Sequence, residues 1–291
     1  MILGIDLGGT NIAMGVVDNG EIVFKREVPV NKTSKDALIS QLRDEISAVK
    51  EKYDIKKVGI GIPGMVDHRR NYIYRCVNVP LVDVDLEREL KDLNVELFIG
   101  NDATVACVAE FGFGKLKGVN DGLLITLGTG IGGGAIVDGK VLYGHNGQAL
   151  EPGHAVIVKN GRKCTCSRNG CFEAYASASR FLEIYNEKSQ NKATSAKEIF
   201  DRHLEGDELA TESISELTDY IAVGLANLAL IFNPQKIILT GGMSKAWPII
   251  KDQLLEKLSN EIIYPKEFHP EVDVSLIDNP GILGASYLCE I

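Results

Sequence analysis

The sequence lacks the features that would assign it to a membrane, to a secretory route or to nucleic acid. No apolar run approaches the roughly 20 residues that a membrane-spanning helix needs, and the start, MILGIDLGG, leaves no room for a signal peptide. Its 31 basic residues are outnumbered by 40 acidic ones, for a net charge of −9, whereas duplex binding depends on clustered lysine and arginine. We therefore expect a cytoplasmic protein without a membrane or nucleic-acid partner.

Two common nucleotide-binding motifs are also missing. Neither of the glycine-rich stretches, at residues 8–11 and 128–134, fits GxxxxGK[ST], so the chain is not a Walker P-loop protein. The second stretch holds no GxGxxG followed by a helix pattern, which disfavours a dinucleotide-binding fold. The chain has 291 residues and 45% apolar residues, which is enough for two globular domains with a core each.

What the sequence does contain is a glycine-rich hairpin pattern that occurs twice. Residues 3–18 read LGIDLGGTNIAMGVVD, and a shift of 120 positions aligns them without a gap on a second copy. Under this shift four residues recur as Leu127, Gly128, Val137 and Asp138. Glycines in such a turn let backbone amides approach an anion closely. The duplication predicts two half-domains that hold one phosphate-bearing ligand, although a single hairpin of this kind is often only a tight turn.

Apolar periodicity predicts an α/β chain. Strands are expected at residues 3–6, 12–17, 22–28, 57–62, 95–99, 122–127, 133–137, 236–240 and 272–277. Ser34 is expected to cap a first helix, and Ser213-x-x-Glu216 reads as a capping box for a later one. The segment 67–83 reads as irregular. Strands that alternate with helices in this order predict mixed sheets flanked by helices.

An Asn101-Asp102 pair follows the fifth expected strand and directly precedes a helix pattern. Acids at the carboxyl end of a strand face the crevice where α/β sheets bind ligands. A positioned carboxylate is also the usual acceptor for the proton of an attacking hydroxyl in phosphoryl transfer. The plain alternative is that one of these two side chains only caps the helix.

Three of the six cysteines lie within eight residues, at Cys164, Cys166 and Cys171, and His154 precedes the first of them by ten. One histidine with three close cysteines matches the donor set of a closed structural zinc site. A redox cluster or three coincidental thiols are the alternatives. The other cysteines stand alone in the sequence and are expected to be buried small hydrophobes.

Together these motifs resemble those of actin-like sugar kinases, and most closely those of the ROK family (repressors, open reading frames and kinases). DLGGTN and LGTGIGGG resemble the two phosphate loops, EPGH at 151–154 resembles the ExGH pattern, and CTCSRNGCFE resembles CxCGxxGCxE with Ser167 in place of a glycine. The resemblance implies a two-domain actin-like (ribonuclease H-like) ATPase fold with a cleft between the domains. A smaller α/β domain would span 1–114 and include a closing helix at 280–291, and a larger α/β domain with the zinc-binding loop would span 115–279.

The resemblance also implies an activity, the ATP-dependent phosphorylation of the 6-hydroxyl of glucose, with Asp102 as the catalytic base. The residues that it implies for sugar binding are Gly64, Asn101, Asp102, Glu151, His154 and Glu173. Those implied for ATP and Mg²⁺ are Asp6, Gly8, Gly9, Thr10, Asn11, Gly128, Thr129, Gly130, Gly241 and Gly242. The implied zinc ligands are His154, Cys164, Cys166 and Cys171. A homo-oligomer, either a dimer or a tetramer, is expected.

Other functions stay open at this point. Glu151 favours glucose, because several N-acetylmannosamine kinases of the resembled family carry histidine there, but N-acetylmannosamine, N-acetylglucosamine, fructose and allose remain alternatives. A non-catalytic sugar sensor is disfavoured by the intact Asn101-Asp102 pair and by the lack of an N-terminal DNA-binding arm. An actin-like ATPase or chaperone would not need the ExGH and cysteine motifs. Polyphosphate in place of ATP is a further alternative.

Overall fold

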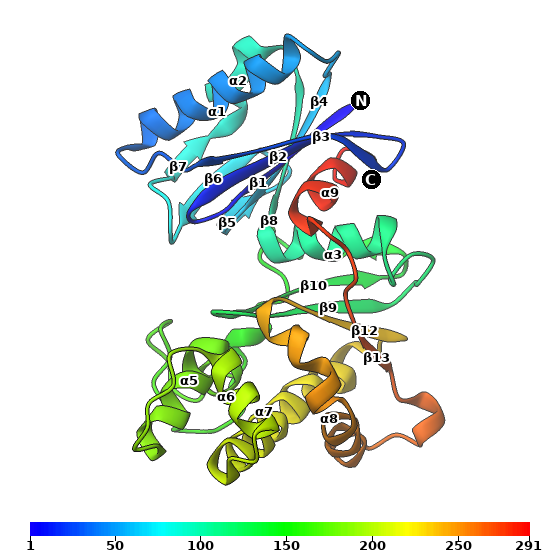
Figure 1. Ribbon diagram of the computed structural model, residues 1–291. Coiled ribbons are helices and arrows are strands. Elements are labelled where there is room, and N and C mark those ends of the chain that lie inside the picture. The colour runs from blue at the N-terminus through cyan, green and yellow to red at the C-terminus, as the bar shows by residue number, and fades with distance from the viewer. The chain divides into compact units, whose positions relative to one another are not determined.

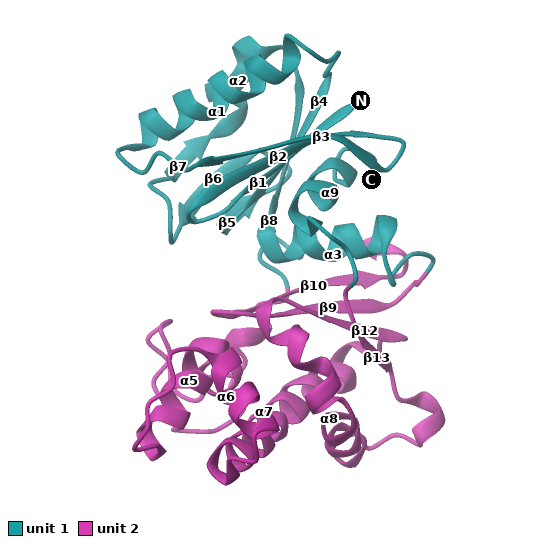
Figure 2. Ribbon diagram, in the orientation of Figure 1, with its two compact units in different colours: residues 1–118, 141–149, 276–291 teal, residues 119–140, 150–275 magenta.

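The computed structural model describes all residues, 1–291, and divides them into two compact units (Figure 2). Unit 1 consists of residues 1–118, 141–149 and 276–291, and unit 2 of residues 119–140 and 150–275. The sequence analysis placed 141–149 in the C-terminal domain, whereas here this short segment belongs to unit 1. Unit 1 is therefore assembled from three separate stretches of the chain, and the last residues pack with the first.

Unit 1 is built on a five-stranded sheet in the order β3-β2-β1-β4-β8 (Figure 1). Its strands are β1 (Ile2–Leu7), β2 (Asn11–Asp18), β3 (Glu21–Pro29), β4 (Lys57–Ile62) and β8 (Glu96–Asn101). β1 pairs antiparallel with β2 and parallel with β4, which pairs parallel with β8. Leu3, Ile5 and Ile60 of the central strands have no exposed surface, as expected for strands that are covered on both faces. The predicted mixed sheet is confirmed.

Four α-helices belong to unit 1: α1 (Lys35–Lys50), α2 (Leu86–Leu90), α3 (Asp102–Phe113) and α9 (Pro280–Tyr287), with a 3₁₀ turn η1 (Lys91–Leu93) after α2. Ser34 caps α1 as predicted, because its side chain accepts a hydrogen bond from the amide of Ala37. The buried face of α1 carries its apolar side chains at helical spacing, which are Leu38, Ile39, Leu42, Ile46 and Val49. This face covers one side of the sheet.

Helix α9 packs closely on the sheet and on α3 (Figure 1). A side chain at Gly4 of β1 would lie 2.1 Å from a carbonyl oxygen of α9, and one at Gly59 of β4 would lie 1.7 Å from another. A side chain at Gly284 of α9 would lie 1.9 Å from a carbonyl oxygen of α3. Glycine is required at these contacts because no Cβ atom fits between the backbones.

The prediction that residues 67–83 are irregular is wrong. This region contributes to a separate three-stranded antiparallel sheet of β5 (Gly64–Asp67), β6 (Tyr72–Cys76) and β7 (Val82–Asp85). The strands are only four or five residues long, and a register shift between Met65 and Val66 interrupts the pairing of β5 with β6. Such short strands show too few alternations, and a bulge breaks the period of two on which a strand prediction depends.

Unit 2 repeats the sheet of unit 1, in the order β11-β10-β9-β12-β13. Its strands are β9 (Gly122–Leu127), β10 (Ile131–Val137), β11 (Lys140–Val141), β12 (Lys236–Thr240) and β13 (Glu271–Val274). β9 pairs antiparallel with β10 and parallel with β12, which pairs parallel with β13. The two units therefore share one sheet topology, in which β9 takes the place of β1. This confirms the two half-domains that the duplicated hairpin predicted.

The two hairpins differ in register by one residue. In the first hairpin Leu7 pairs with Ile12, whereas in the second Leu127 pairs with Ile131. The first turn therefore holds residues 8–11 and the second only residues 128–130. A shift of 120 matches β1 to β9, but β2 matches β10 with a shift of 119. The ungapped alignment is corrected in this respect, because one residue is missing from the second turn.

The helices of unit 2 are α4 (Glu173–Ala176), α5 (Ala178–Lys188), α6 (Ala196–Leu204), α7 (Glu208–Phe232) and α8 (Trp247–Glu261). Short 3₁₀ turns are η2 (Pro152–His154), η3 (Gly242–Ala246) and η4 (Lys266–Phe268). α7 is long and apolar enough to cross a membrane by length and composition alone. Its buried residues include Ile214, Leu217, Ile221 and Leu225, which is the pattern of a core helix.

The capping box predicted at Ser213 is also wrong. α7 begins at Glu208, and Asp207 caps it by accepting a hydrogen bond from the amide of Ala210 at 2.8 Å. Ser213 lies within the helix, where it is buried and its hydroxyl has no hydrogen-bond partner. The sequence pattern of a capping box occurs here by chance, because Asp207 provides an earlier and equally good cap.

Candidate active site and metal centre

The predicted site residues divide between the two units. Those in unit 1 are Asp6, Gly8, Gly9, Thr10, Asn11, Gly64, Asn101 and Asp102. Those in unit 2 are Gly128, Thr129, Gly130, Glu151, His154, Cys164, Cys166, Cys171, Glu173, Gly241 and Gly242. Within each unit most of them lie at the ends of sheet strands or in the turns that follow.

Asp6 is the penultimate residue of β1, and α9 covers its side chain. A Cβ atom on Gly281 would lie 2.2 Å from Oδ2 of Asp6, so only glycine allows this approach. The pKa of Asp6 is raised from 3.8 to about 6, mainly by desolvation and in smaller part by the charges of Asp102 and then Glu27. A cation beside Asp6 would favour the ionised carboxylate and offset this rise.

Asn101 is the last residue of β8 and caps α3. Its Oδ1 atom accepts a hydrogen bond from the amide of Ala103 at 3.0 Å, and its Nδ2 atom donates to the carbonyl oxygen of Gly64 at 3.1 Å. The alternative that one member of the pair caps the helix is therefore correct for Asn101. The same bonds fix Gly64 beside the start of α3, which brings three of the predicted sugar-binding positions together.

Asp102 is the first residue of α3 and does not serve as its cap. Oδ1 of Asp102 accepts a hydrogen bond from the amide of Ala103 at 2.9 Å. Burial raises the pKa of Asp102 above its usual 3.8, while hydrogen bonds from the backbone and from Asn101 oppose this rise. The residue is solvent-accessible at the start of the helix, and a carboxylate with a raised pKa is a stronger base than one with the usual pKa, which suits proton transfer near neutral pH.

The first glycine turn, residues 8–11, is closed by a hydrogen bond from the amide of Gly8 to the carbonyl oxygen of Asn11 at 2.9 Å. The side chain of Asn11 donates to Glu27 of β3 at 2.6 Å, which holds the end of the turn. A residue that the sequence analysis missed, Asn78, lies over this turn. A Cβ atom on Gly9 would be 3.0 Å from Cβ of Asn78, and no motif marks that position.

The second glycine turn, residues 128–130, is held by the start of α5. The amide of Ala178 donates a hydrogen bond to the carbonyl oxygen of Gly128 at 2.8 Å. The hydroxyl of Ser179 donates one to the carbonyl oxygen of Thr129 at 3.1 Å. The amide of Gly128 donates a hydrogen bond to the carbonyl oxygen of Gly130 at 3.0 Å. The amides of Thr129 and Gly130 take part in none of these bonds, and unpaired amides in a glycine turn are the donors that bind phosphate oxygens.

Glu173 connects this turn to the cysteine-rich loop. Its Oε2 atom accepts a hydrogen bond from the amide of Ile131 at 3.0 Å, and its Oε1 atom accepts one from the hydroxyl of Thr165 at 3.2 Å. Each carboxylate oxygen can accept a second hydrogen bond, so a hydroxyl of a ligand can still bind. The sequence analysis missed Thr165, which lies between two of the cysteines.

His154, Cys164, Cys166 and Cys171 come together as predicted, with all four candidate donor atoms within 4.8 Å of one another. Sγ of Cys164 lies 3.7 Å from Nδ1 of His154, and Sγ of Cys166 lies 3.6 Å from Sγ of Cys171. Tetrahedral zinc with bonds of about 2.3 Å to sulfur places two sulfur atoms about 3.8 Å apart. The four residues therefore fit a closed tetrahedral zinc site.

The departure from the family pattern at Ser167 has a visible consequence. Ser167 adopts a left-handed backbone conformation with a φ of 73°, which glycine adopts at lower cost. Its amide donates to the carbonyl oxygen of Cys164 at 3.1 Å and closes the turn between the ligands. The turn that a glycine usually forms is thus retained here, and no ligand is displaced.

His154 is the last residue of η2, and its amide donates to the carbonyl oxygen of Glu151 at 3.1 Å. Because Nδ1 of His154 faces the cysteines, Nε2 is the ring nitrogen that remains for a substrate hydroxyl. Leu150, directly before Glu151, has a φ of 61°. A left-handed conformation at a non-glycine residue is strained and is often found beside functional groups.

A cavity of about 380 Å³ lies within unit 2 beside the Gly241-Gly242 turn. Its lining is mainly apolar and includes Phe200 of α6, Met243 of η3 and Ala178 of α5. Gly241 has a φ of 93° and would place a Cβ atom 2.6 Å from the carbonyl oxygen of Leu127, so glycine is required at this turn. The sequence analysis predicted the glycines but assigned no role to α6.

The ROK family model matches residues 2–290. The glucokinase of Halalkalibacterium halodurans is 36% identical over 309 aligned positions, which cover 98% of this chain and 94% of that protein. The crystal structure of a ROK hexokinase from Thermus thermophilus matches with a TM-score of 0.88 and 30% identity, over 99% of this chain and 97% of that one.

A ROK family glucokinase from Streptomyces griseus, solved in complex with glucose and AMPPNP, matches with a TM-score of 0.80 and 29% identity. The match covers 99% of this chain and 98% of that one. These matches confirm the predicted two-domain actin-like ATPase fold. Because both the family model and the relative span nearly the whole sequence, the chain belongs to the ROK family.

Proposed function

We propose that this chain is an ATP-dependent hexose kinase that transfers the γ-phosphoryl group of ATP to the 6-hydroxyl of glucose. The observation that carries the proposal is the carboxylate of Asp102, which lies at the start of α3 beside Asn101 and has a raised pKa, in a chain that matches the model of a family with glucokinases over residues 2–290. A sugar sensor has no need for a strand-end base of this kind, and a simple ATPase, which would use such a base to activate water, has no need for the ExGH and cysteine motifs.

Asp102 accepts the proton of the 6-hydroxyl while the hydroxyl oxygen attacks the γ-phosphorus of ATP. A bond from oxygen to phosphorus forms, the bond from phosphorus to the bridging oxygen breaks, and ADP leaves. Desolvation raises the pKa of Asp102, so the carboxylate binds this proton more strongly than an aspartate with the usual pKa does. Asn101, which caps α3 and bonds to Gly64, keeps Asp102 in place and lines the sugar site.

The phosphates of ATP bind to the amides of the two glycine turns, at residues 8–11 and 128–130. Mg²⁺, when bound with ATP, neutralises phosphate charge, and Asp6 would help to hold it. The support for this role is the chemistry of the residue, because a half-buried acid whose pKa is raised to about 6 is stabilised in its ionised form by a nearby cation. Adenosine occupies the apolar cavity beside Gly242, where Phe200 and Met243 offer contact to the base.

The hexose hydroxyls bind to Glu151, to Nε2 of His154 and to Glu173, with Gly64 and Asn101 from unit 1. Glu151 accepts hydrogen bonds from hydroxyls of an unsubstituted sugar, and an acetamido group would remove one of these donors. Glu151 is exposed in the structure and becomes covered when a sugar binds, and an acceptor that is covered without its donor can reject a substrate strongly. This is the reason to place glucose before the N-acetylated sugars, whereas the preference over fructose and allose is supported by the glucokinases among the relatives.

Zinc held by His154, Cys164, Cys166 and Cys171 would be structural, because all four tetrahedral positions are filled by protein atoms and none remains for water. It would fix the ring of His154 and thereby orient Nε2 toward the sugar. We further propose that the protein acts in the cytoplasm as a homo-oligomer, without nucleic acid or membrane as a partner, in keeping with its net charge of −9.

A coupled assay of ADP release, with and without sugar, tests the proposal. A kinase releases ADP only when a hexose is present, a sensor releases none, and an ATPase releases ADP without sugar. The sugar assignment is tested by kcat/KM for glucose, mannose, N-acetylglucosamine, N-acetylmannosamine, fructose and allose under one condition. If another sugar exceeds glucose by about tenfold, the choice of glucose is wrong and the kinase assignment stands. Replacing ATP with polyphosphate in the same assay, with glucose 6-phosphate as the readout, tests the donor.

A further inference from the structure

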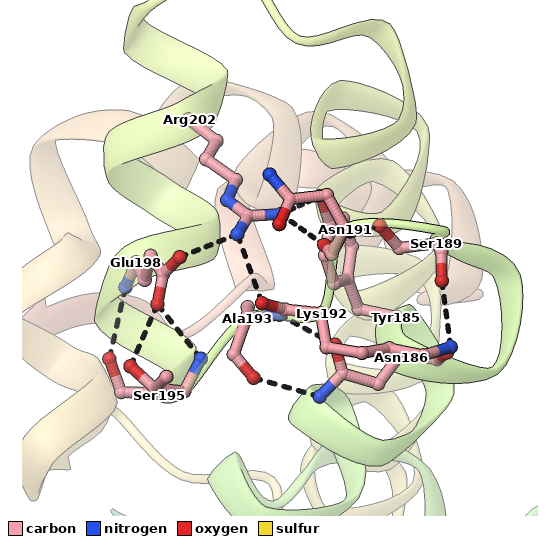
Figure 3. Close-up of polar contacts among 10 residues, drawn as sticks. Tyr185, Asn186, Ser189, Asn191, Lys192, Ala193, Ser195, Glu198 and Arg202 are labelled. Carbon is pink, nitrogen blue, oxygen red and sulfur yellow. Dashed lines mark hydrogen bonds and ion pairs between the residues drawn. The ribbon is translucent and has the colours of Figure 1, made fainter.

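Helix α6 carries a dense polar network toward α5 and the loop before α6 (Figure 3). Arg202 donates hydrogen bonds to the hydroxyl of Tyr185 at 2.9 Å and to the carbonyl oxygens of Asn191 and Lys192 at 2.6 and 3.2 Å. It also forms an ion pair with Glu198 at 2.5 Å. One guanidinium group thus connects α6 to α5 and to the loop of residues 189–195 between them.

The same loop is held by two further side chains. Both donors of Thr194, its amide and its hydroxyl, bond to Glu198 at 2.8 Å. The side-chain amide of Asn186 pairs with the backbone of Ala193, donating at 2.9 Å and accepting at 2.8 Å. Side chains of α5 and α6 therefore satisfy backbone groups of the loop that no strand or helix partner satisfies. We call Tyr185, Asn186, Glu198 and Arg202 the α6 latch.

The latch is more than a surface ion pair. The side chain of Arg202 is only 14% exposed, and it bonds to four different residues from three segments of the chain. Exposed ion pairs contribute little because water competes with both partners. Here Glu198 is 34% exposed, and the rigidity comes from the number of bonds that one guanidinium group makes to separate segments. Thr194 and Arg202 lower the pKa of Glu198 to about 2, so its charge is present throughout the neutral range.

The opposite face of α6 forms one wall of the cavity described above. Ala196, Lys197, Phe200 and Asp201 line the cavity, while Glu198 and Arg202 point to the latch. No residue of the latch is part of the cavity lining. The other wall comes from η3 and the start of α8, so the width of the cavity depends on where α6 is held.

We propose that Arg202 is a positioning residue for the nucleotide, which holds the α6 wall of the cavity and thereby sets the affinity for ATP without touching it. The inference rests on the proposed function, in which the cavity takes adenosine. A displacement of α6 changes the contact of Phe200 with the base, while Asp102 and the sugar-binding residues keep their own supports. The effect is therefore specific to the nucleotide.

The test measures binding of AMPPNP without sugar by calorimetry, together with KM for ATP and for glucose. For Arg202→Ala we expect the Kd of AMPPNP and KM for ATP to rise about tenfold, with KM for glucose within about twofold of wild type. Arg202→Lys retains part of the network, so its Kd for AMPPNP and its KM for ATP should lie between those of wild type and Arg202→Ala. Lys188→Ala is the matched control, because it removes an ion pair of 2.5 Å between α5 and Glu216 of α7 that does not involve α6.

Two outcomes would overturn the proposal. Equal changes in KM for both substrates would show that Arg202 supports the unit as a whole, and unchanged AMPPNP binding would show that the latch is irrelevant to the nucleotide. Glu198→Gln gives a milder second variant, to be used where Arg202→Ala does not fold by circular dichroism. Ala196→Leu fills part of the cavity itself. If that variant binds AMPPNP normally, the cavity is not the nucleotide site, and if it alone loses binding, only the latch proposal fails.

Discussion

The two glycine hairpins share one backbone plan and differ in charge. Asp6 in β1 corresponds to Thr126 in β9, each one residue before the end of its strand and in a sheet of the same order. Asp6 is a half-buried acid that α9 contacts, whereas the hydroxyl of Thr126 accepts a hydrogen bond from the amide of Gly132 at 2.9 Å. One strand end therefore presents an ionisable group, and the other a neutral turn that is bonded internally.

This difference suggests how a duplicated scaffold divides the work of phosphoryl transfer. Unit 1 contains two acids at or beside strand ends, the half-buried Asp6 and the exposed Asp102, whose pKa values are raised. They suit proton transfer and cation binding. Unit 2 offers neutral backbone amides, an apolar cavity and a cysteine-histidine cluster, which suit binding without chemistry. The predictions below test this division.

The largest effect is expected for Asp102→Asn, which removes the proposed base of unit 1. We expect kcat to fall by about 10²-fold to 10⁴-fold with nearly unchanged sugar binding, because only proton transfer is lost. The wild-type rate should also decline as the pH falls through the raised pKa of Asp102, since the base must be ionised. Steady-state kinetics over a range of pH measure both effects.

Asp85 offers a matched control for that experiment. It also lies at a strand end in unit 1 and caps α2 through the amide of Arg88 at 3.0 Å. Asparagine caps a helix as well as aspartate does, so Asp85→Asn should leave kcat unchanged. A near wild-type rate for Asp102→Asn would mean that unit 1 does not supply the base and that the division of labour is wrong.

The second effect concerns the stability that the protein loses at neutral pH because unit 1 has Asp6 at the position where unit 2 has Thr126. The pKa of Asp6 is raised to about 6 in the folded protein, against 3.8 for the unfolded chain. The stability linked to this shift is fully present below about pH 3.8 and is lost as the pH rises through about 6, with an upper limit of about 3 kcal/mol. Asp6→Asn should therefore be more stable than wild type at pH 7.5 without Mg²⁺, and lose activity.

Urea unfolding at pH 4 and at pH 7.5 measures this effect, with Asp85→Asn as the control. The gain of the Asp6→Asn variant should appear at pH 7.5 and be absent or much smaller at pH 4. A gain in unfolding free energy of equal size at both pH values would come from packing and not from charge. The difference between Asp6 and Thr126 would then not be electrostatic.

The third effect concerns the cluster that unit 2 has and unit 1 lacks. We expect one zinc ion per chain, and Cys166→Ser should lose it, lower the melting temperature and raise KM for glucose about tenfold through a misoriented His154. Metal analysis of protein purified without chelator measures the zinc content, and thermal unfolding measures the melting temperature. Cys289→Ala is the control, because Cys289 is a buried thiol of unit 1 remote in sequence from the cluster. Absence of zinc from the wild-type protein would falsify the assignment.

Features with a local signature were predictable from the sequence. Strand β1, the cap at Ser34 and the strand-end position of Asp102 follow from periodicity, capping chemistry and the order of elements. The cluster of His154 with three cysteines could be predicted because metal ligands must be particular residue types that lie close in space. In each case the physical requirement falls on the residue itself or on its neighbours in sequence.

Features made by distant contacts were not predictable. Asn78 lies over the first glycine turn, and Thr165 bonds to Glu173, because separate segments meet. The single missing residue in the second turn appears only when β9 and β10 are paired. Arg202 resembles any exposed helical arginine until its partners on α5 and the loop are known. The residues of the sheet from β5 to β7 gave too short a pattern to be recognised.

The smallest effect compares Gly8 with Gly128, which occupy the same place in the two hairpins. A Cβ atom on Gly8 would lie 2.9 Å from the carbonyl oxygen of Asn11, whereas one on Gly128 would meet no atom closer than 3.9 Å. The two turns are closed by different bonds, to Asn11 in the first and to Gly130 in the second. Gly8→Ala should therefore cost about 1 kcal/mol of stability through this close contact, while Gly128→Ala should be neutral or stabilising by about 0.5 kcal/mol through a stiffer unfolded chain. Urea unfolding of the two variants without nucleotide measures the difference. If both alanines cost the same, the two turns are equivalent in packing despite their different lengths, and the one-residue difference has no energetic consequence.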